Sequence, residues 1–224
     1  MPYKTSLNLP ADFAITHHAG AFGKEDNSLE SVEFSTSENA DIIEFDVTFR
    51  RDGTPVIIHK GEPEDNEGAS FEKALEIVSK AQKTKINLDL KSVKNLPEVD
   101  RLVKKYNMEK RVFFTGVGEE WTDTVKSNSF IPYFLNYALT KEESEDKEKA
   151  EKLASKISSH GAIGLNSYYE FASDLICSVM HKNNLLVSFW TVNDSEAAER
   201  VAKCLPDNIT TRKPDVVKEV IESL

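Results

Sequence analysis

The residues best suited to chemistry include His17 and His59, each of which closes a short apolar run that resembles a β-strand. Glu44 and Asp46 stand near the end of a further run, IIEFDV. They are two residues apart, so in a strand both carboxylates point to the same side. Burying two acids in so apolar a segment is costly unless they serve a purpose. The pattern therefore predicts a functional site rather than a solvated strand edge.

Asp89 and Lys91 repeat this spacing at the end of the next strand-like run. Three carboxylates that converge on one site repel one another unless a cation lies among them. Ligands that are all oxygen atoms favour a hard divalent ion, Mg²⁺ or Ca²⁺, over zinc. Two histidines beside such an ion suit a reaction that removes one proton and delivers another. Phosphodiester cleavage is such a reaction, because a metal offsets charge on the phosphate oxygens.

The elements that must position these side chains alternate between two patterns. Short runs rich in β-branched and aromatic residues are typical of strands, and they fall at roughly 12–17, 41–47, 54–59, 84–90, 111–115, 131–136, 161–165, 185–190 and 208–211. Longer amphipathic segments are typical of helices, and they fall near 28–39, 70–82, 95–106, 119–127, 144–159, 171–182, 194–203 and 214–223.

Regular alternation of this kind predicts a parallel sheet. The second and third strand-like runs are joined only by RRDG, where Asp52-Gly53 signals a tight turn, so they form one unit with a returning arm. Counted in this way, strand units and helices repeat eight times. We therefore expect an α/β fold, a (β/α)₈ barrel in a single domain over residues 1–224, with catalytic groups at the carboxyl ends of its strands. A doubly wound open sheet is the competing topology.

Composition narrows the range of partners. The chain holds 28 basic and 38 acidic residues, a formal charge of −10, which disfavours binding to nucleic acid unless one face is locally basic. We expect a cytoplasmic protein without membrane insertion, because neither an apolar span nor a secretion signal is evident. Cys177 and Cys204 are expected to be buried and unpaired, and the charged run at 141–152 to lie on the solvated face of a helix. Oligomeric state stays open.

Several segments, in chain order, resemble the glycerophosphodiester phosphodiesterase family. They are ITHHAG at 15–20, DNSLES at 26–31, IIEFDVTFRRDGTPVIIH at 42–59, LDLK at 88–91, FWTVND at 189–194 and TTRKPD at 210–215. The segment from Glu44 to His59 is specific by itself, and FWTVND adds weight to it.

The resemblance implies a small-molecule substrate, a glycerophosphodiester, that is hydrolysed to glycerol 3-phosphate and a free alcohol. If the adjacent glycerol hydroxyl attacks first, a cyclic phosphate forms, which water then opens. It makes His17 and His59 the acid–base pair. The residues implied to bind the metal are Glu44, Asp46 and Asp89, and those implied to bind the substrate are His18, Lys91 and Trp190. Lys91 would contact the phosphate, and Trp190 would lie beside the alcohol.

The sequence departs from the family pattern at several positions. His18 stands where the family has an arginine that clamps phosphate, and Asp89 stands where a glutamate ligand is usual. Lys60 replaces an aspartate after His59 and could partly compensate for the arginine. The usual insertion after this histidine is nearly absent, since KGEPEDNEGAS leads directly into the next helix, so we expect an open pocket.

Three other functions compete with this one. A phospholipase-type lyase of related design would stop at the cyclic phosphate. A metal-dependent amidohydrolase expects His-x-His after the first strand, and the adjacent pair His17-His18 does not provide that spacing because the two side chains point to opposite faces. A barrel that binds a phosphorylated ligand without turnover is the third alternative, although it has no need of two acid–base histidines.

Overall fold

The computed structural model describes residues 3–224, and its strands and helices alternate along the chain. The strands are β1 (Ala14–His17), β2 (Ile42–Phe49), β3 (Pro55–Ile57), β4 (Ala69–Ser70), β5 (Lys85–Leu90), β6 (Val112–Val117), β7 (Tyr133–Asn136), β8 (Gly164–Tyr168), β9 (Leu186–Trp190) and β10 (Asn208–Thr211). The helices are α1 (Leu29–Ser37), α2 (Phe71–Ser79), α3 (Leu96–Lys105), α4 (Thr122–Asn128), α5 (Lys141–Glu145), α6 (Lys147–Ser159), α7 (Asp174–Lys182), α8 (Ser195–Lys203) and α9 (Pro214–Ser223).

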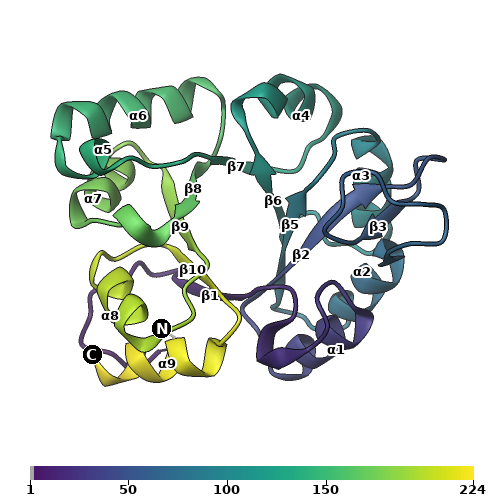
Figure 1. Ribbon diagram of the computed structural model, residues 1–224, viewed down its shortest axis with the longest axis horizontal. Coiled ribbons are helices and arrows are strands. Elements are labelled where there is room, and N and C mark those ends of the chain that lie inside the picture. Colours follow the sequence, from purple (N-terminus) through teal and green to yellow (C-terminus); the bar gives the residue numbers. More distant parts are fainter. Residues whose placement is uncertain (1–2) are drawn as a thin grey trace.

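Eight parallel strands within residues 3–224 close into a barrel, with the helices around it (Figure 1). The order around the ring is β1, β10, β9, β8, β7, β6, β5 and β2. A direct pairing of β1 with β2 completes the ring, with Thr16 opposite Ile42 and His17 opposite Ile43. The expected (β/α)₈ barrel is confirmed. The doubly wound alternative is wrong, because an open sheet would leave β1 and β2 unpaired with each other.

An antiparallel arm extends from β2. Strand β3 pairs with the last residues of β2, and β4 pairs with β3. The turn between β2 and β3 contains Gly53 at φ +86°, a conformation that suits glycine and confirms the expected tight turn. Residues 58–68, between β3 and β4, contain no helix. The arm therefore returns the chain to the barrel mouth and places His59 there.

Helix starts follow the expected chemistry. Ser28, Ser70 and Asp194 each accept a hydrogen bond from the backbone N–H three residues further on, and Pro214 opens α9. The charged run 141–152 differs from a single helix. The backbone is extended at Asp146, φ −109° and ψ 116°, and this residue both ends α5 and caps α6.

The barrel strands bury side chains on both faces. Outward residues are apolar and pack under the helices: Ile15, Ile43, Phe45, Val47, Ile86, Leu88, Val187, Phe189 and Ile209 are all buried. The alternate residues of these strands point into the barrel, are largely polar and form hydrogen bonds across the interior. Thr16 donates to Asn208 over 2.7 Å, and Asn208 donates to Ser188 over 2.9 Å. The barrel interior beneath the mouth is therefore polar, like the site above it.

One expectation outside the site is also confirmed. Cys177 and Cys204 are buried free thiols, as expected. Among the helices of residues 3–224, none is long and apolar enough to cross a membrane.

Candidate active site

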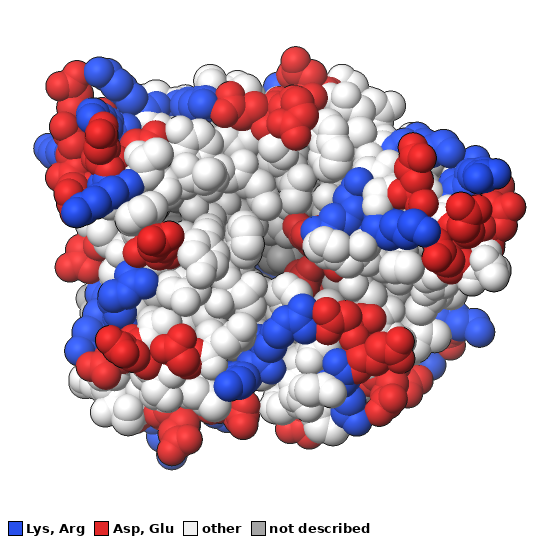
Figure 2. All heavy atoms as spheres, in the orientation of Figure 1, with Lys and Arg blue, Asp and Glu red and all other residues white. Residues whose placement is uncertain are grey.

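A cavity of about 490 Å³ opens at the carboxyl ends of the barrel strands. Figure 2 shows the face of the molecule hollowed near its centre, with acidic and basic side chains around the hollow. The residues that line it are His18, Asp26, Glu44, Asp46, His59, Asn87, Asp89, Leu90, Lys91, Thr115, Gly116, Glu120, Trp121, Asn136, Asn166, Trp190, Thr191, Thr210 and Arg212.

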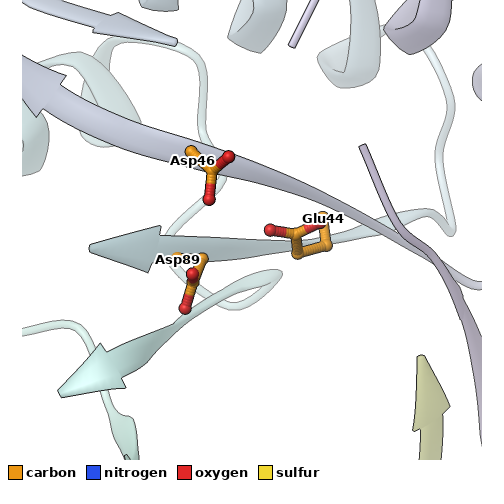
Figure 3. A group of neighbouring side chains, drawn as sticks. All are labelled: Glu44, Asp46 and Asp89. Carbon is orange, nitrogen blue, oxygen red and sulfur yellow. The ribbon is translucent and has the colours of Figure 1, made fainter. Parts of the chain in front are cut away.

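Three carboxylates meet on one side of this cavity (Figure 3). Glu44 and Asp46 come from β2, and Asp89 comes from the neighbouring strand β5, where it is paired in register with Asp46. One oxygen atom from each lies within 4.8 Å of the others. The predicted convergence of the acids is thus confirmed. A set of carboxylate oxygens this close together fits a hard divalent cation.

The pKa values of Glu44 and Asp46 are shifted in opposite directions. Burial raises the pKa of Glu44 well above its ordinary value, and the charges of Asp46 and Asp89 raise it further. Glu44 accepts one backbone hydrogen bond, from the N–H of Ala19 at 2.9 Å. Burial would also raise the pKa of Asp46, but the ammonium of Lys91 and other hydrogen bonds outweigh it and hold that pKa below its ordinary value. An ion at the triad would relieve the repulsion that Glu44 experiences.

Lys91 already supplies a positive charge beside the acids. Its Nζ lies 3.0 Å from Oδ1 of Asp46 and donates a hydrogen bond to Asp89. Burial alone would lower the pKa of Lys91, but Asp89 and Asp46 together raise it above its ordinary value. The lysine is therefore a fixed cation inside the site.

Polar neighbours hold two of the carboxylates in place. Asn27 donates from Nδ2 to Oδ2 of Asp46 over 2.7 Å and accepts from the backbone N–H of Asp46 over 2.8 Å. The Thr115 hydroxyl lies 2.8 Å from Oδ1 of Asp89. Asn27 adopts φ +56°, a conformation that asparagine tolerates better than most residues. Asn27 thus positions a carboxylate, and the neighbouring Ser28 caps α1.

His17 does not lie in this cavity, which corrects the expectation from the sequence. Its side chain has the parity of the apolar face and lines a separate hollow under α9, where its ring meets Phe22 edge to face at 5.3 Å. His17 is 8% exposed, and within residues 3–224 its Nδ1 has no hydrogen-bond partner. Burial lowers the pKa of His17 to about 4. The physical reason is strand alternation, which turns adjacent side chains to opposite faces.

His18 takes the inward place instead and lines the cavity, as His59 does. The Nδ1 atom of His18 lies 2.9 Å from the carbonyl oxygen of Ala19 and 3.6 Å from Oε2 of Glu44. The Nδ1 atom of His59 lies 3.1 Å from Oδ2 of Asp46. Each of these two histidines therefore contacts one acid of the triad.

Trp190, at the end of β9, is also among the residues of this cavity. It is 36% exposed and meets Tyr168 edge to face at 5.9 Å between ring centroids. Lys60 does not compensate for a missing arginine inside the cavity, because its Nζ instead pairs with Glu67 at 2.5 Å in the exposed arm.

Sequence reasoning missed Asp26, Asn27 and Arg212 as site residues. Arg212 directly follows a strand-like run and has the same parity as Asn208 and Thr210, a signal that could have marked it. Asp26 and Asn27 lie in a loop before α1, and no spacing rule predicts that such a loop folds onto the triad. The signal that could have marked them is their place in DNSLES, a segment that resembles the family.

The closed parallel barrel, with an acid triad and two histidines at its mouth, places the protein in the class of (β/α)₈ barrels, a class of fold whose active sites lie at this end of the strands. The family model of the glycerophosphoryl diester phosphodiesterases matches residues 10–65 and 62–216. The chain therefore belongs to this family of phosphodiester-hydrolysing enzymes. No curated protein sequence matches the chain.

Solved structures of similar fold support the architecture. A structure designated a glycerophosphoryl diester phosphodiesterase, from Silicibacter pomeroyi, is 18% identical with a TM-score of 0.78, covering 98% of this chain and 95% of that one. An Oleispira antarctica phosphodiesterase in complex with the product sn-glycerol-3-phosphate is 18% identical with a TM-score of 0.74, covering 96% and 97%. A glycerophosphodiester phosphodiesterase from Parabacteroides distasonis is 16% identical with a TM-score of 0.73, covering 95% and 98%.

Proposed function

We propose that the protein hydrolyses glycerophosphodiesters to glycerol 3-phosphate and an alcohol, with Mg²⁺ or Ca²⁺ held by Glu44, Asp46 and Asp89. When bound, the ion supplies charge that offsets the phosphate oxygens. The observation that carries this proposal is that each of two histidines lining the cavity contacts one acid of the triad. Family membership and the complex of the Oleispira antarctica phosphodiesterase with sn-glycerol-3-phosphate support the choice of substrate.

His18, in place of His17, and His59 are the proposed acid–base pair. A carbonyl oxygen only accepts hydrogen bonds, so the contact with Ala19 assigns the proton of the neutral His18 ring to Nδ1 and leaves a lone pair on Nε2. His18 then takes the proton of the attacking water as the water oxygen bonds to phosphorus. Where the adjacent glycerol hydroxyl attacks instead, it forms a cyclic phosphate, which water opens to glycerol 3-phosphate in a second step. The bond between phosphorus and the alcohol oxygen breaks, and His59 delivers a proton to that oxygen. Lys91 and Trp190 are proposed to contact the phosphate side and the alcohol side, respectively.

A matched set of variants tests this assignment. The changes His18→Leu, His59→Leu and His17→Leu are compared with the unmodified protein on glycerophosphoglycerol, -ethanolamine and -choline, with Mg²⁺, Ca²⁺ or EDTA. Release of glycerol 3-phosphate is measured by a coupled assay, and phosphorus NMR identifies any cyclic product. We expect the changes at His18 and His59 to lower kcat about 10²–10⁴-fold, the range of general acid–base catalysis.

Each outcome bears on a separate element of the proposal. Absence of turnover on all three diesters with either ion would reject the hydrolase and leave a binding barrel. A cyclic phosphate that persists would replace hydrolysis by a lyase reaction. Full activity in EDTA would reject the ion, and full activity of His18→Leu would reject its role as base.

A further inference from the structure

Arg212 has no role in the reaction as proposed so far, yet its side chain lines the same cavity as the triad. It directly follows β10, which runs beside β1, with Thr211 opposite His17. The backbone N–H of His18 donates to the carbonyl of Thr211 over 2.9 Å. The two strand ends are therefore tied together, and they place Arg212 on the side of the cavity where His18 lies.

Asp26 holds the Arg212 guanidinium in a two-pronged ion pair. The two distances are 2.5 Å from Nη1 to Oδ1 and 2.7 Å from Nη2 to Oδ2. This hydrogen bonding raises the pKa of Arg212 and lowers that of Asp26. A guanidinium has five N–H donors, and Asp26 uses two of them. Residues 3–224 supply no acceptor to Nε, so a forked edge of donors stays available to a ligand.

Gly20 makes room for this pair. It has φ +75°, and a Cβ atom there would lie 2.0 Å from Oδ1 of Asp26 and 2.9 Å from Nη1 of Arg212. The ion pair therefore packs directly against the main chain, where a side chain would expel it. The next residue, Asn27, grips Asp46 through two hydrogen bonds. One loop thus fixes the guanidinium and an acid of the triad together.

Charge also singles out Arg212. The cavity is lined by five acidic residues: Asp26, Glu44, Asp46, Asp89 and Glu120. It is lined by two basic ones, Lys91 and Arg212. Lys91 is already divided between Asp46 and Asp89. An anionic phosphodiester that enters this acidic cavity needs further positive charge, and Arg212 provides the planar fork that matches phosphate oxygens.

We propose that Arg212 binds the phosphate of the substrate and that Asp26 is a positioning residue that acts through Arg212. This inference rests on the proposed function, since it names the group that holds the phosphate at that site. It adds a phosphate contact from the end of the last barrel strand to the one proposed for Lys91 at the end of β5.

The test compares Arg212→Gln, Arg212→Lys, Asp26→Asn and the double variant of Arg212→Gln with Asp26→Asn. Arg101→Gln is the matched control, because Arg101 forms a similar forked pair with Glu98, at 2.7 and 2.8 Å, on the exposed surface of α3. Binding of glycerol 3-phosphate with saturating Mg²⁺ is measured by calorimetry, and KM and kcat are measured on glycerophosphoethanolamine. Thermal unfolding confirms that each variant is folded.

Arg212→Gln should weaken binding of glycerol 3-phosphate and raise KM about 10- to 100-fold, the range for hydrogen bonds to a charged group. Arg212→Lys should recover part of this loss, since a lysine keeps the charge without the fork. Arg101→Gln should match the unmodified protein. Asp26→Asn should raise KM by itself and have no added effect beside Arg212→Gln, because it reaches the phosphate only through Arg212.

Unchanged binding of glycerol 3-phosphate in Arg212→Gln would overturn the inference, as would independent, additive effects of the two changes. If Arg212→Gln does not fold, unchanged binding in Arg212→Lys would overturn it equally. Calorimetry separates this outcome from failure of the proposed function. One result would reject the proposed hydrolysis but keep the phosphate site at Arg212. In it, the unmodified protein hydrolyses no diester but binds glycerol 3-phosphate, and Arg212→Gln weakens that binding.

Discussion

His17→Leu should make the folded protein less sensitive to acid while leaving its hydrolytic activity unchanged. His17 is buried under α9 and its Nδ1 has no hydrogen-bond partner among residues 3–224. Burial lowers the pKa of His17 from 6.5 to about 4. Between these two pH values the unfolded chain binds a proton at this position that the folded protein excludes, so the free energy of unfolding falls as pH falls.

The size of the effect follows from these two values. A pKa difference of one unit corresponds to about 1.4 kcal/mol. For His17 the loss of stability relative to pH 7 is about 2 kcal/mol at pH 5 and about 3 kcal/mol at pH 4, where the effect approaches its limit. Leucine has no proton to gain and leaves no polar atom unmet in the hollow. The variant should therefore lack this part of the pH dependence and be at least as stable at pH 7.

Urea unfolding at pH 7, 6, 5 and 4.5 measures the free energy of unfolding of His17→Leu and of the unmodified protein. The difference in unfolding free energy between His17→Leu and the unmodified protein should grow in favour of the variant as pH falls. Steady-state kinetics at pH 7 on one glycerophosphodiester provides the control. If the unfolding free energies of the two proteins change equally with pH, burial does not lower the pKa of His17 as argued. A loss of kcat comparable to that of His18→Leu would return His17 to the active site.

Three further predictions concern the triad. Asn27→Ala removes two hydrogen bonds from Asp46. It should weaken Mg²⁺ binding, measured by calorimetry, about 10- to 100-fold, the usual effect of losing a residue that supports a metal ligand. An unchanged affinity would show that Asp46 needs no such support. Lys91→Met leaves Asp46 and Asp89 without their ammonium partner, so its melting temperature should fall in EDTA and recover more than that of the unmodified protein when Mg²⁺ is added. Equal melting temperatures in EDTA would contradict it. Gly116→Ala places a Cβ atom 2.5 Å from the Leu90 carbonyl oxygen and 2.8 Å from Oδ1 of Asp89, at a residue with φ +73°. The free energy of unfolding in urea should therefore fall by at least about 1 kcal/mol, and the Asp89 carboxylate should be displaced. A variant as stable as the unmodified protein would refute the close approach.

Much of the architecture could be predicted from the sequence because the signals are local. Strand-like and helix-like periods, the Asp52-Gly53 turn and the caps at Ser28, Ser70 and Asp194 depend on neighbouring residues alone. The pairing of Glu44 with Asp46 on one face follows from the two-residue repeat of a strand. Parallel strands of a barrel end at the same edge, which is why the position of Asp89 at a strand end is enough to predict that it lies beside them.

The sequence by itself determined the barrel, the acid triad and the presence of histidines at its mouth. It did not determine which of two adjacent histidines faces inward, because both faces of a barrel strand are buried and a shift by one residue exchanges them. Only the register of β1 between β2 and β10 decided that His17 lies under the helices and His18 in the cavity. Tertiary structure also brought Asp26 to Arg212 across 186 positions of sequence, a contact that no local pattern records.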